Sequence, residues 1–365
     1  MNEFNDIYRN KNVLVTGHTG FKGAWLSLWL STLGANVTGF SKSVPTEPSN
    51  FVASNLKESI NHVEGDILDF ELLGKILELE QPDFIFHLAA QSLVKESYVN
   101  PMNTWNTNTI GTLTLLEAVR QSGIKTKIIL ITSDKCYDNV EWLWGYREND
   151  RLGGPDPYSA SKGAAELVIS SYHRSFFSSG DVSIVSARAG NVIGGGDWAS
   201  DRIVPDCMKA WSKEEVVDLR KPNATRPWQH VLEPLSGYLV LGEKLSSIPA
   251  LNGESYNFGP NANNTQSVLE LVEEVAKYWS SARYNDVSDG YEGPYESGLL
   301  KLNCDKALHD LSWNAVLEFS DTVRLTAKWY RSFYEDVDAR MDVICTDQIK
   351  EYTEIARTSG MTWAN

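Results

Sequence analysis

The chain of 365 residues has only four cysteines, and no two of them stand at a metal-ligand or redox spacing. Cys136, Cys207, Cys304 and Cys345 are therefore expected to be free thiols in a reducing compartment, and no metal site is expected. No apolar run approaches the roughly 18 residues that a membrane span needs. The first six residues are polar and acidic, unlike a secretory signal peptide. These absences predict a soluble, cytoplasmic protein.

Basic residues are also in the minority. The 33 Lys and Arg stand against 48 Asp and Glu, which gives a formal net charge of −15. Such a charge argues against nucleic acid and anionic membranes as partners. It leaves a nucleotide ligand open, because a few local Lys and Arg side chains are enough to bind phosphate. The hydrophobic fraction of 42% and the length of the chain predict a full core and two lobes.

Short β-rich segments alternate with helical patterns through the first half of the chain. Strands are expected at Asn12–Thr16, Asn36–Phe40, Ile60–Glu64, Asp83–Leu88, Lys127–Thr132 and Val182–Arg188. Helices are expected at Lys22–Leu33, Leu68–Leu79 and Thr104–Gln121, and a further helix begins near Tyr158. This alternation predicts an α/β protein with a Rossmann-type, doubly wound parallel sheet.

After residue 190 the sequence becomes rich in glycine, proline and tryptophan. We therefore expect a Rossmann domain over residues 1–190 and a smaller, substrate-binding lobe over most of residues 191–340. The helical pattern at 232–245 is expected to return to the first domain, so that the two are interleaved. Residues 341–365 form a polar, helix-compatible tail to which the sequence assigns no function.

Three glycines mark the first strand-to-helix junction. Gly17, Gly20 and Gly23 follow the first expected strand directly and open an amphipathic helix. Glycines at such a junction permit a tight turn and close backbone approach, and the helix N-terminus attracts a pyrophosphate. The junction therefore predicts a dinucleotide site, against the alternative of an ordinary glycine-rich turn.

The residues expected at the adenosine end leave the choice of dinucleotide open. The acidic residue that binds the ribose hydroxyls in many dehydrogenases is missing, and Ser41 and Lys42 stand in its place. A serine and a lysine suit a 2′-phosphate, so the residues alone do not separate NAD from NADP. Asp66 is placed either to reach the adenine or to cap a helix that starts at Leu68. The small residues after His87 permit close approach of a cofactor or simply a tight turn.

Two further groups carry the reaction chemistry. Tyr158 and Lys162 lie four residues apart on a predicted helix, so their side chains share one face, and a nearby ammonium favours the phenolate form of tyrosine. Ser133, Asp134 and Lys135 follow an apolar strand, at the end of the sheet where ligands bind. Ser133 could hydrogen-bond the reacting hydroxyl, Asp134 could protonate a leaving hydroxyl, and a neutral Lys135 could remove a carbon-bound proton. A surface turn with a local Asp–Lys pair is the alternative.

These motifs resemble those of the extended short-chain dehydrogenase/reductase family over roughly residues 10–330. The resemblance rests on the glycine loop, on His87-Leu88-Ala89-Ala90, on Ser133 and on the Tyr158–Lys162 pair. Within that family the chain is similar to the nucleotide-sugar 4,6-dehydratases, and to their branch that acts on CDP-glucose. His18 in the glycine loop, Asp134-Lys135 in place of the more common Asp-Glu, and the segment 226–231 carry this similarity.

The resemblance implies NAD as the cofactor and CDP-glucose as the substrate, with water lost from the sugar. The residues expected at the cofactor are Gly17, His18, Gly20, Phe21, Gly23, Ser41, Lys42, Asp66, Ile67, Leu88, Ala89, Ala90, Tyr158 and Lys162. It also implies that Asn191, Arg202 and Arg226 hold the substrate's diphosphate. Pairing through helices 104–121 and 158–178 implies a homodimer or homotetramer. A sugar-nucleotide 4-epimerase and a cofactor-binding sensor without turnover remain as alternatives.

Overall fold

A seven-stranded sheet with the order β3-β2-β1-β4-β5-β6-β11 forms the centre of the computed structural model, which describes residues 3–261, 264–289 and 299–365. Every neighbouring pair of its strands is parallel. The strands are β1 (Asn12–Thr16), β2 (Asn36–Ser41), β3 (Asn61–Glu64), β4 (Phe84–His87), β5 (Thr126–Ile131), β6 (Val182–Ala189) and β11 (Ser255–Phe258). The predicted Rossmann-type sheet is confirmed. The chain reverses direction across the sheet between β1 and β4, and a ligand crevice forms at such a switch point.

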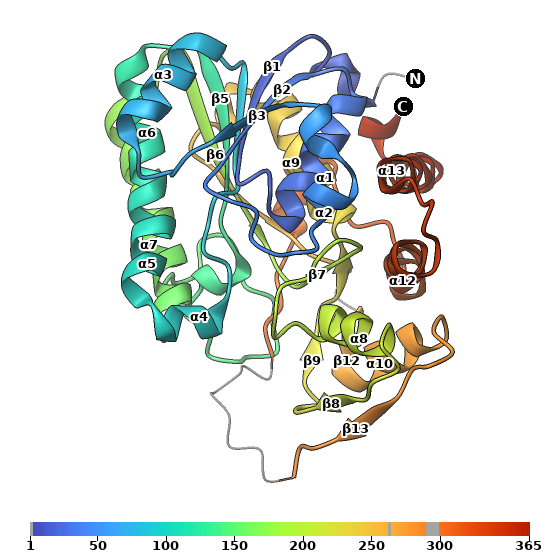
Figure 1. Ribbon diagram of the computed structural model, residues 1–365. Coiled ribbons are helices and arrows are strands. Elements are labelled where there is room, and N and C mark those ends of the chain that lie inside the picture. The colour runs from blue at the N-terminus through green and yellow to red at the C-terminus, as the bar shows by residue number, and fades with distance from the viewer. Residues whose placement is uncertain (1–2, 262–263, 290–298) are drawn as a thin grey trace.

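Helices cover both faces of this sheet (Figure 1). One face carries α3 (Phe70–Glu80), α6 (Gly111–Ser122) and α7 (Pro157–Tyr172), and the other carries α1 (Phe21–Thr32) and α9 (Leu232–Leu245). Two separate apolar cores result, and β1 contributes to both, with Leu14 in one and Val13 and Val15 in the other. This alternation explains why the central strands are apolar on both faces.

Two predicted helices have different bounds in the structure. The segment predicted as one helix over 104–121 consists of α5 (Pro101–Trp105), a π-helical stretch (Asn106–Ile110) and α6. Asn108 explains the interruption, because its amide donates to the Gln91 carbonyl at 3.0 Å and to Ser161 Oγ at 2.9 Å. The prediction that Asp66 caps a helix at Leu68 is wrong. Asp69 caps α3 by accepting a hydrogen bond from the Leu72 N–H, while Asp66 accepts one from Leu68 within the preceding turn.

The smaller lobe lies below the sheet in Figure 1. Its elements are α4 (Val94–Val99) at the boundary, β7 (Val192–Ile193), α8 (Ile203–Trp211), β8 (Val217–Leu219), β9 (Thr225–Arg226), β10 (Gln229–His230), β12 (Gln266–Ser267), α10 (Val268–Ala276) and β13 (Tyr284–Asp286). The chain between them returns to the sheet twice, as the predicted helix α9 and as the edge strand β11. Sequence reasoning missed β11, which is four residues long and alternates polar with aromatic side chains.

The C-terminal segment packs against the Rossmann domain. Helix α13 (Met341–Thr358) contacts α1 and α12 (Phe319–Glu335), and the Trp363 ring stacks on Phe4 at 4.9 Å. The buried carboxylate of Glu233, on α9, accepts hydrogen bonds from the Tyr352 hydroxyl and from the backbone N–H groups of Val316 and Leu317. This carboxylate therefore joins α9, α13 and the loop before α12 in one buried network. The remaining helices are α2 (Asn50–Ala53) and α11 (Asp305–Leu311).

The raised pKa of the Glu233 carboxyl predicts how the free energy of unfolding changes with pH. Burial raises the pKa of its carboxyl from 4.5 to about 7, against the opposing effect of its hydrogen bonds. Between these two values the folded state holds the proton more tightly than the unfolded chain, so the contribution of Glu233 to the free energy of unfolding falls as pH rises through this window. We expect Glu233→Gln to remove a pH dependence of about 2–3 kcal/mol, which urea unfolding at pH 5 and pH 8 would measure.

The matched control is Glu78→Gln, because Glu78 is exposed on α3. This variant should keep the pH dependence of the wild type. The same dependence in Glu233→Gln would show that the Glu233 carboxyl does not titrate in this window.

Candidate active site

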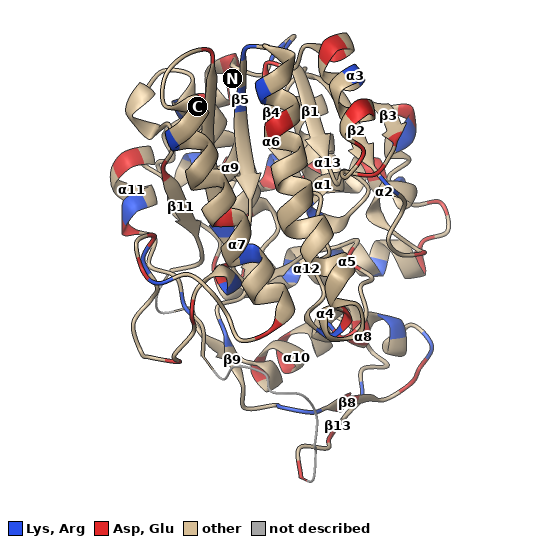
Figure 2. Ribbon diagram, turned by 90° about the vertical axis from the view of Figure 1, so that its left-hand side faces the viewer, with Lys and Arg blue, Asp and Glu red and all other residues tan. Residues whose placement is uncertain are grey.

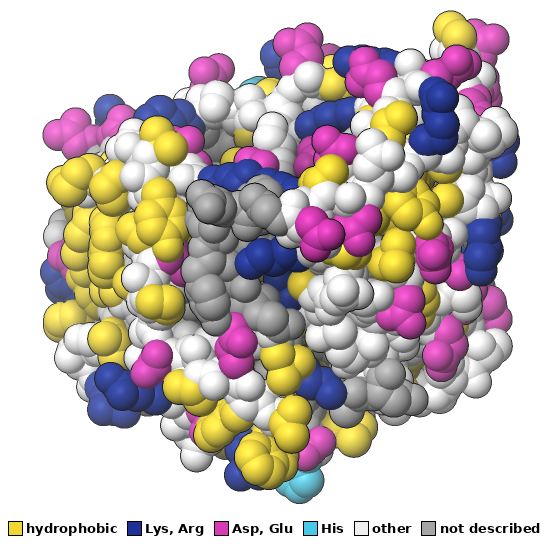
Figure 3. All heavy atoms as spheres, turned by 90° about the horizontal axis from the view of Figure 1, so that it is seen from below, with side chains coloured by type: hydrophobic (Ala, Val, Ile, Leu, Met, Phe, Trp, Pro, Cys, Tyr) yellow, Lys and Arg dark blue, Asp and Glu magenta, His cyan; other side chains and the backbone are white. Residues whose placement is uncertain are grey.

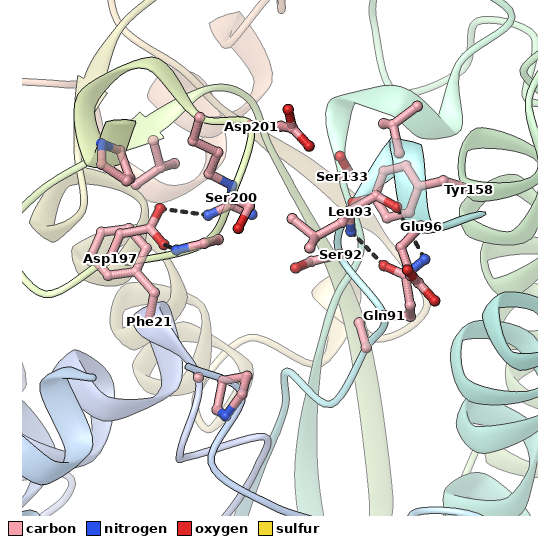
Figure 4. A pocket seen from close by; sticks show the side chains of 18 of the residues that line it. Phe21, Gln91, Ser92, Leu93, Glu96, Ser133, Tyr158, Asp197, Ser200 and Asp201 are labelled. Atoms are coloured by element: carbon pink, nitrogen blue, oxygen red, sulfur yellow. Dashed lines mark hydrogen bonds and ion pairs between the residues drawn. The ribbon is translucent and has the colours of Figure 1, made fainter. Parts of the chain in front are cut away.

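A cavity of about 1840 Å³ opens at the carboxyl ends of the strands, between the sheet and the smaller lobe. Figure 4 shows Ser133 and Tyr158 on one side of it and Phe21 and Asp197 on the other. Seen from below, Lys and Arg side chains lie in and around the hollow of this face (Figure 3). An acidic protein therefore has a cavity with local positive charge, which suits a phosphate-bearing ligand.

The glycine loop lies along one wall of this cavity. Gly17 has a φ of +76°, and a Cβ there would stand 2.7 Å from the Ala89 backbone nitrogen. A Cβ on Gly23 would stand 2.2 Å from the Gly17 carbonyl oxygen, so both positions exclude a side chain. Helix α1 begins at Phe21 with no side-chain cap on its N-terminus. Its first N–H groups are thus available to an anion, and the loop fits a dinucleotide pyrophosphate.

His18 lies behind this loop. Its side chain is buried and does not line the cavity, in contrast to its neighbours in the loop. Its Nδ1 is 3.0 Å from Ser41 Oγ and its Nε2 is 2.7 Å from His62 Nδ1. Burial lowers the pKa of His18 to about 4, with His62 adding to the effect, so the ring is neutral near pH 7. His18 therefore reaches the cavity through Ser41, which does line it.

Lys42 and Asp66 form an ion pair at the adenosine end of the cavity, with 2.7 Å between Nζ and Oδ2. Burial alone would raise the pKa of Asp66, but the hydrogen bonds from Lys42 and the Leu68 N–H, together with the charge of Lys42, outweigh it and the pKa is lowered. A 2′-phosphate here would face the Asp66 carboxylate, and the ammonium beside it is already paired. The pair therefore favours NAD over NADP. Ile67, Leu88, Ala89 and Ala90 line the cavity next to it.

The Ser133–Asp134–Lys135 segment forms a short 3₁₀ turn directly after β5. Ser133 Oγ accepts a hydrogen bond from the Lys135 N–H at 3.2 Å and donates one to Asp134 Oδ1 at 2.9 Å. A Cβ on Gly190 would stand 3.1 Å from Asp134 Oδ2, so this glycine leaves room for the carboxylate. Burial raises the pKa of Asp134, against the opposing effects of Lys135 and Ser133. A carboxyl group with a raised pKa is suited to donate a proton.

Tyr158 and Lys162 lie on the first turns of α7, which begins at Pro157 behind the cap of Asp156. Burial raises the pKa of Tyr158 to about 12, although the Ser133 hydroxyl opposes the shift. Burial also lowers the pKa of Lys162 to about 8. The net shift disfavours the phenolate, because desolvation of the phenol outweighs the charges around it. That the Lys162 ammonium favours the phenolate stays a prediction.

The three residues expected at the diphosphate all line the same cavity. Arg202 precedes α8 and pairs with Asp197 at 2.6 Å, Arg226 lies on β9, and Asn191 lies between β6 and β7. Lys22, which sequence reasoning passed over, joins them. Burial lowers its pKa to about 8, with Asp134 opposing and Arg202 and Lys162 adding to the shift. Its place inside the glycine loop was the signal that could have identified it.

A buried ion pair below the reacting groups was also missed. Arg188 Nη2 on β6 is 2.8 Å from Glu166 Oε2 on α7, and both side chains are 3% exposed. Glu166 also accepts hydrogen bonds from Thr132, at the end of β5, and from Ser186 on β6. The pair holds α7 against the two strands whose ends carry the reacting groups. Among the described residues, no cluster of His, Cys, Asp and Glu could hold a metal ion.

A parallel sheet with a pyrophosphate loop at its switch point and a Tyr-x-x-x-Lys helix beside it defines an NAD-dependent enzyme of the extended short-chain dehydrogenase/reductase class. Residues 14–326 match the family described as GDP-mannose 4,6 dehydratase. The chain belongs to this family.

Individual relatives agree with this assignment. The chain is 44% identical to the CDP-glucose 4,6-dehydratase of Salmonella typhimurium, over 95% of this chain and 97% of that protein. Among solved structures, an epimerase from Methanothermobacter thermautotrophicus has a TM-score of 0.76 at 25% identity, covering 92% of this chain and 96% of that one. The dTDP-glucose 4,6-dehydratase of Bacillus anthracis, solved in complex with NAD, has a TM-score of 0.74 at 23% identity, covering 89% and 98%.

The Lys42–Asp66 pair generates a prediction about cofactor choice. Asp66→Asn should release the Lys42 ammonium and remove the carboxylate that would repel a 2′-phosphate. We expect the ratio of the NADP and NAD dissociation constants to shift toward NADP by about three- to tenfold, as for an exposed ion pair. Titration of tryptophan fluorescence with each cofactor measures this ratio.

The double variant Lys42→Ala/Asp66→Asn is the control and should lose the gain, because it lacks the released cation. An unchanged ratio in Asp66→Asn would mean that the pair does not decide the cofactor.

Proposed function

We propose that this protein is an NAD-dependent hydro-lyase that converts CDP-glucose to CDP-4-keto-6-deoxyglucose and water. The observation that carries the proposal is the buried Asp134, beside Lys135, in the same cavity as Tyr158 and Lys162. A reaction that only transfers hydride requires no such acid–base pair, whereas loss of water requires both an acid and a base. The 44% identity to a CDP-glucose 4,6-dehydratase over nearly the whole chain supports the same substrate.

Tyr158 is proposed to remove the proton of the 4-hydroxyl group, with Ser133 as hydrogen-bond partner of the same oxygen. The ammonium of Lys162, one turn along α7, stabilises the phenolate that forms. NAD, when bound, would supply the redox chemistry, as acceptor and then donor of the hydride that the sugar loses and regains. Gly17, Gly20 and Gly23 hold its pyrophosphate on the N-terminus of α1.

Lys135 and Asp134 are proposed to carry out the elimination. A ketone at C4 acidifies the C5–H bond, so that Lys135 in its neutral form can remove the proton. The carboxyl group of Asp134, whose pKa is raised by burial, donates a proton to the departing 6-hydroxyl.

Arg202, Arg226 and Asn191 are proposed to bind the diphosphate of the substrate. Guanidinium groups match the phosphate oxygens with two parallel hydrogen bonds. The 4-epimerase alternative shares the fold and Tyr158, and the sensor alternative requires only the cofactor loop. Neither explains a buried Asp134 at the end of β5.

We also propose that the protein is a cytoplasmic homodimer or homotetramer. Helices α6 and α7 lie side by side on one outer face, with few charged side chains along them (Figure 2). Apolar side chains also gather at the edge of the molecule where α4 and α5 lie (Figure 3). Val99, Met102, Leu167 and Phe176 are among the exposed large hydrophobic residues of this region. No helix among the described residues is long and apolar enough to span a membrane.

The test of the proposed function is turnover with a panel of nucleotide sugars. The pure protein with NAD should form the 4-keto product from CDP-glucose, measured by the alkaline absorbance of the product and by mass spectrometry. Each polar group left unpaired by a different base costs about 1–3 kcal/mol, so UDP-, GDP- and dTDP-glucose should be poorer substrates. Equal kcat/KM for CDP- and UDP-glucose would remove the CDP assignment and leave the dehydratase assignment standing. A product with inverted C4 and an intact 6-hydroxyl would indicate an epimerase.

The roles of Lys135 and Asp134 predict separable defects. Lys135→Met should stop both loss of water and exchange of the C5 hydrogen with solvent deuterium, yet permit the oxidation at C4. Asp134→Asn should block loss of water by about 10²–10⁴-fold, as removal of a general acid does, and leave C5 exchange detectable. Single-turnover NADH absorbance and mass spectrometry of sugar recovered from heavy water measure the two steps.

Normal C5 exchange and elimination by Lys135→Met would show that another group is the base. Lys306→Met is the control. Lys306 donates a hydrogen bond to Glu254 in an exposed contact, so this variant should behave as the wild type in both measurements.

A further inference from the structure

The cavity continues beyond the reacting groups into the smaller lobe, where its walls become apolar. Ile203, Asp206 and Ala210 line it from α8 at positions three and four residues apart, which places them on one face of that helix. The other face of α8 buries Cys207, Met208 and Trp211 in the core. Asp206 is therefore the polar side chain on an otherwise apolar wall.

The strand β8 and its neighbours form the adjoining wall. Helix α8 contacts β8, whose buried residues Val217 and Leu219 line the cavity together with Val268 and Val287. The Val287 N–H donates to the Leu219 carbonyl at 3.0 Å, which extends this wall. β8 and β13 lie at the end of the smaller lobe that is farthest from the sheet (Figure 1). Asp218, Arg220 and Lys221 also line this part of the cavity, and each of them has an interaction elsewhere in the protein. This part of the cavity is therefore a slot with apolar and charged walls.

The carboxylate of Asp206 has no side-chain hydrogen bond or ion pair among the residues that the structure describes. The cations around it have partners elsewhere. Lys209 donates to the Trp198 carbonyl at 2.6 Å, and Lys95 and Arg220 both pair with Asp201. Burial raises the pKa of Asp206. A partly buried acceptor without a donor is costly, so a hydrogen-bond donor is expected when the slot is filled.

The position of the slot indicates which part of the substrate fills it. Arg202, proposed to bind the diphosphate, immediately precedes α8, and its charge acts on Tyr158 at the reacting end. In a nucleotide sugar the diphosphate separates the sugar from the nucleoside. With the sugar at Tyr158, the base must lie on the far side of Arg202, toward α8 and β8. A planar base with polar edges matches a slot in which apolar side chains alternate with a few polar groups.

We infer that Asp206 recognises the cytosine base by accepting a hydrogen bond from its exocyclic 4-amino group. This inference rests on the proposed function and assigns a specificity-determining residue to it. Carboxylates accept from the cytosine 4-amino group in base recognition generally. Uracil and thymine carry a carbonyl oxygen at the same position. This oxygen and the carboxylate are both hydrogen-bond acceptors, so no hydrogen bond can form between them. Asp206 thereby favours CDP-glucose and disfavours UDP- and dTDP-glucose.

The experiment compares kcat/KM for CDP-glucose and UDP-glucose in the wild type and in variants of this position. Asp206→Asn should reduce the preference for CDP-glucose by about 10–100-fold, mainly through a higher KM for CDP-glucose, because an amide can donate as well as accept. Asp206→Glu keeps the carboxylate and should retain a preference for CDP-glucose. Glu215→Gln is the matched control, since it removes the same charge from an exposed position just after α8 and should leave the preference unchanged.

Binding of CDP and UDP without the sugar, measured by calorimetry, gives a second readout that does not depend on turnover. In Asp206→Asn, the preference for CDP over UDP in binding should fall in the same proportion as the preference in kcat/KM. If Asp206→Asn does not fold, Asp206→Ser replaces it in both measurements. A full CDP preference in folded Asp206 variants, or an equal loss for both nucleotides, would overturn the inference and leave the proposed function intact. No preference in the wild type would instead remove the CDP assignment itself.

Discussion

The buried ion pair between Glu166 and Arg188 is the contact on which the geometry of the active site depends. Burial alone would raise the pKa of Glu166, but the charge of Arg188 and the hydrogen bonds from Arg188, Thr132 and Ser186 together outweigh it, and the pKa is lowered. The pair joins α7, which carries Tyr158 and Lys162, to β6 and to the end of β5. Removing one partner of such a pair leaves an unpaired charge in the protein interior, which is strongly destabilising. The pair therefore fixes the position of Tyr158 and Lys162 on α7 relative to Asp134 and Lys135, which follow β5.

Desolvation is the second constraint, and it shifts four groups of the cavity toward their neutral forms. It raises the pKa of Tyr158 and Asp134 and lowers the pKa of Lys162 and Lys22. A carboxyl group with a raised pKa, such as that of Asp134, is suited to donate a proton. The same burial that makes these residues costly for stability prepares them for acid–base chemistry.

The charges that line the cavity differ from those of the chain as a whole. The whole chain has a net charge of −15, whereas the cavity is lined by nine Lys and Arg and eight Asp and Glu, with Lys22, Lys162, Arg202 and Arg226 among the cations. Local charge at short range decides ligand binding, because the charges on the outer surface are screened by salt. An anionic nucleotide sugar can therefore bind inside an acidic protein. Asp206 lines the same cavity on α8, where the proposed recognition places the uncharged base.

Sequence alone determined where the strands of the parallel sheet lie along the chain, and it identified the glycine loop and the helix that carries Tyr158 and Lys162. Each of these features depends on neighbours within a few residues. The bounds of β1 and α9 agree with the predicted ones, since strand and helix periodicity is a local property. Only the tertiary structure decided that Lys42 meets Asp66, that Glu166 meets Arg188 and that His18 lies behind the loop. It also decided that the Asp206 side chain has no hydrogen-bond or ion-pair partner within the described part of the chain. These facts depend on which distant segments the fold brings together. The net pKa shift of Tyr158 belongs with them, because desolvation is set by everything packed around a group, and no local pattern contains that information.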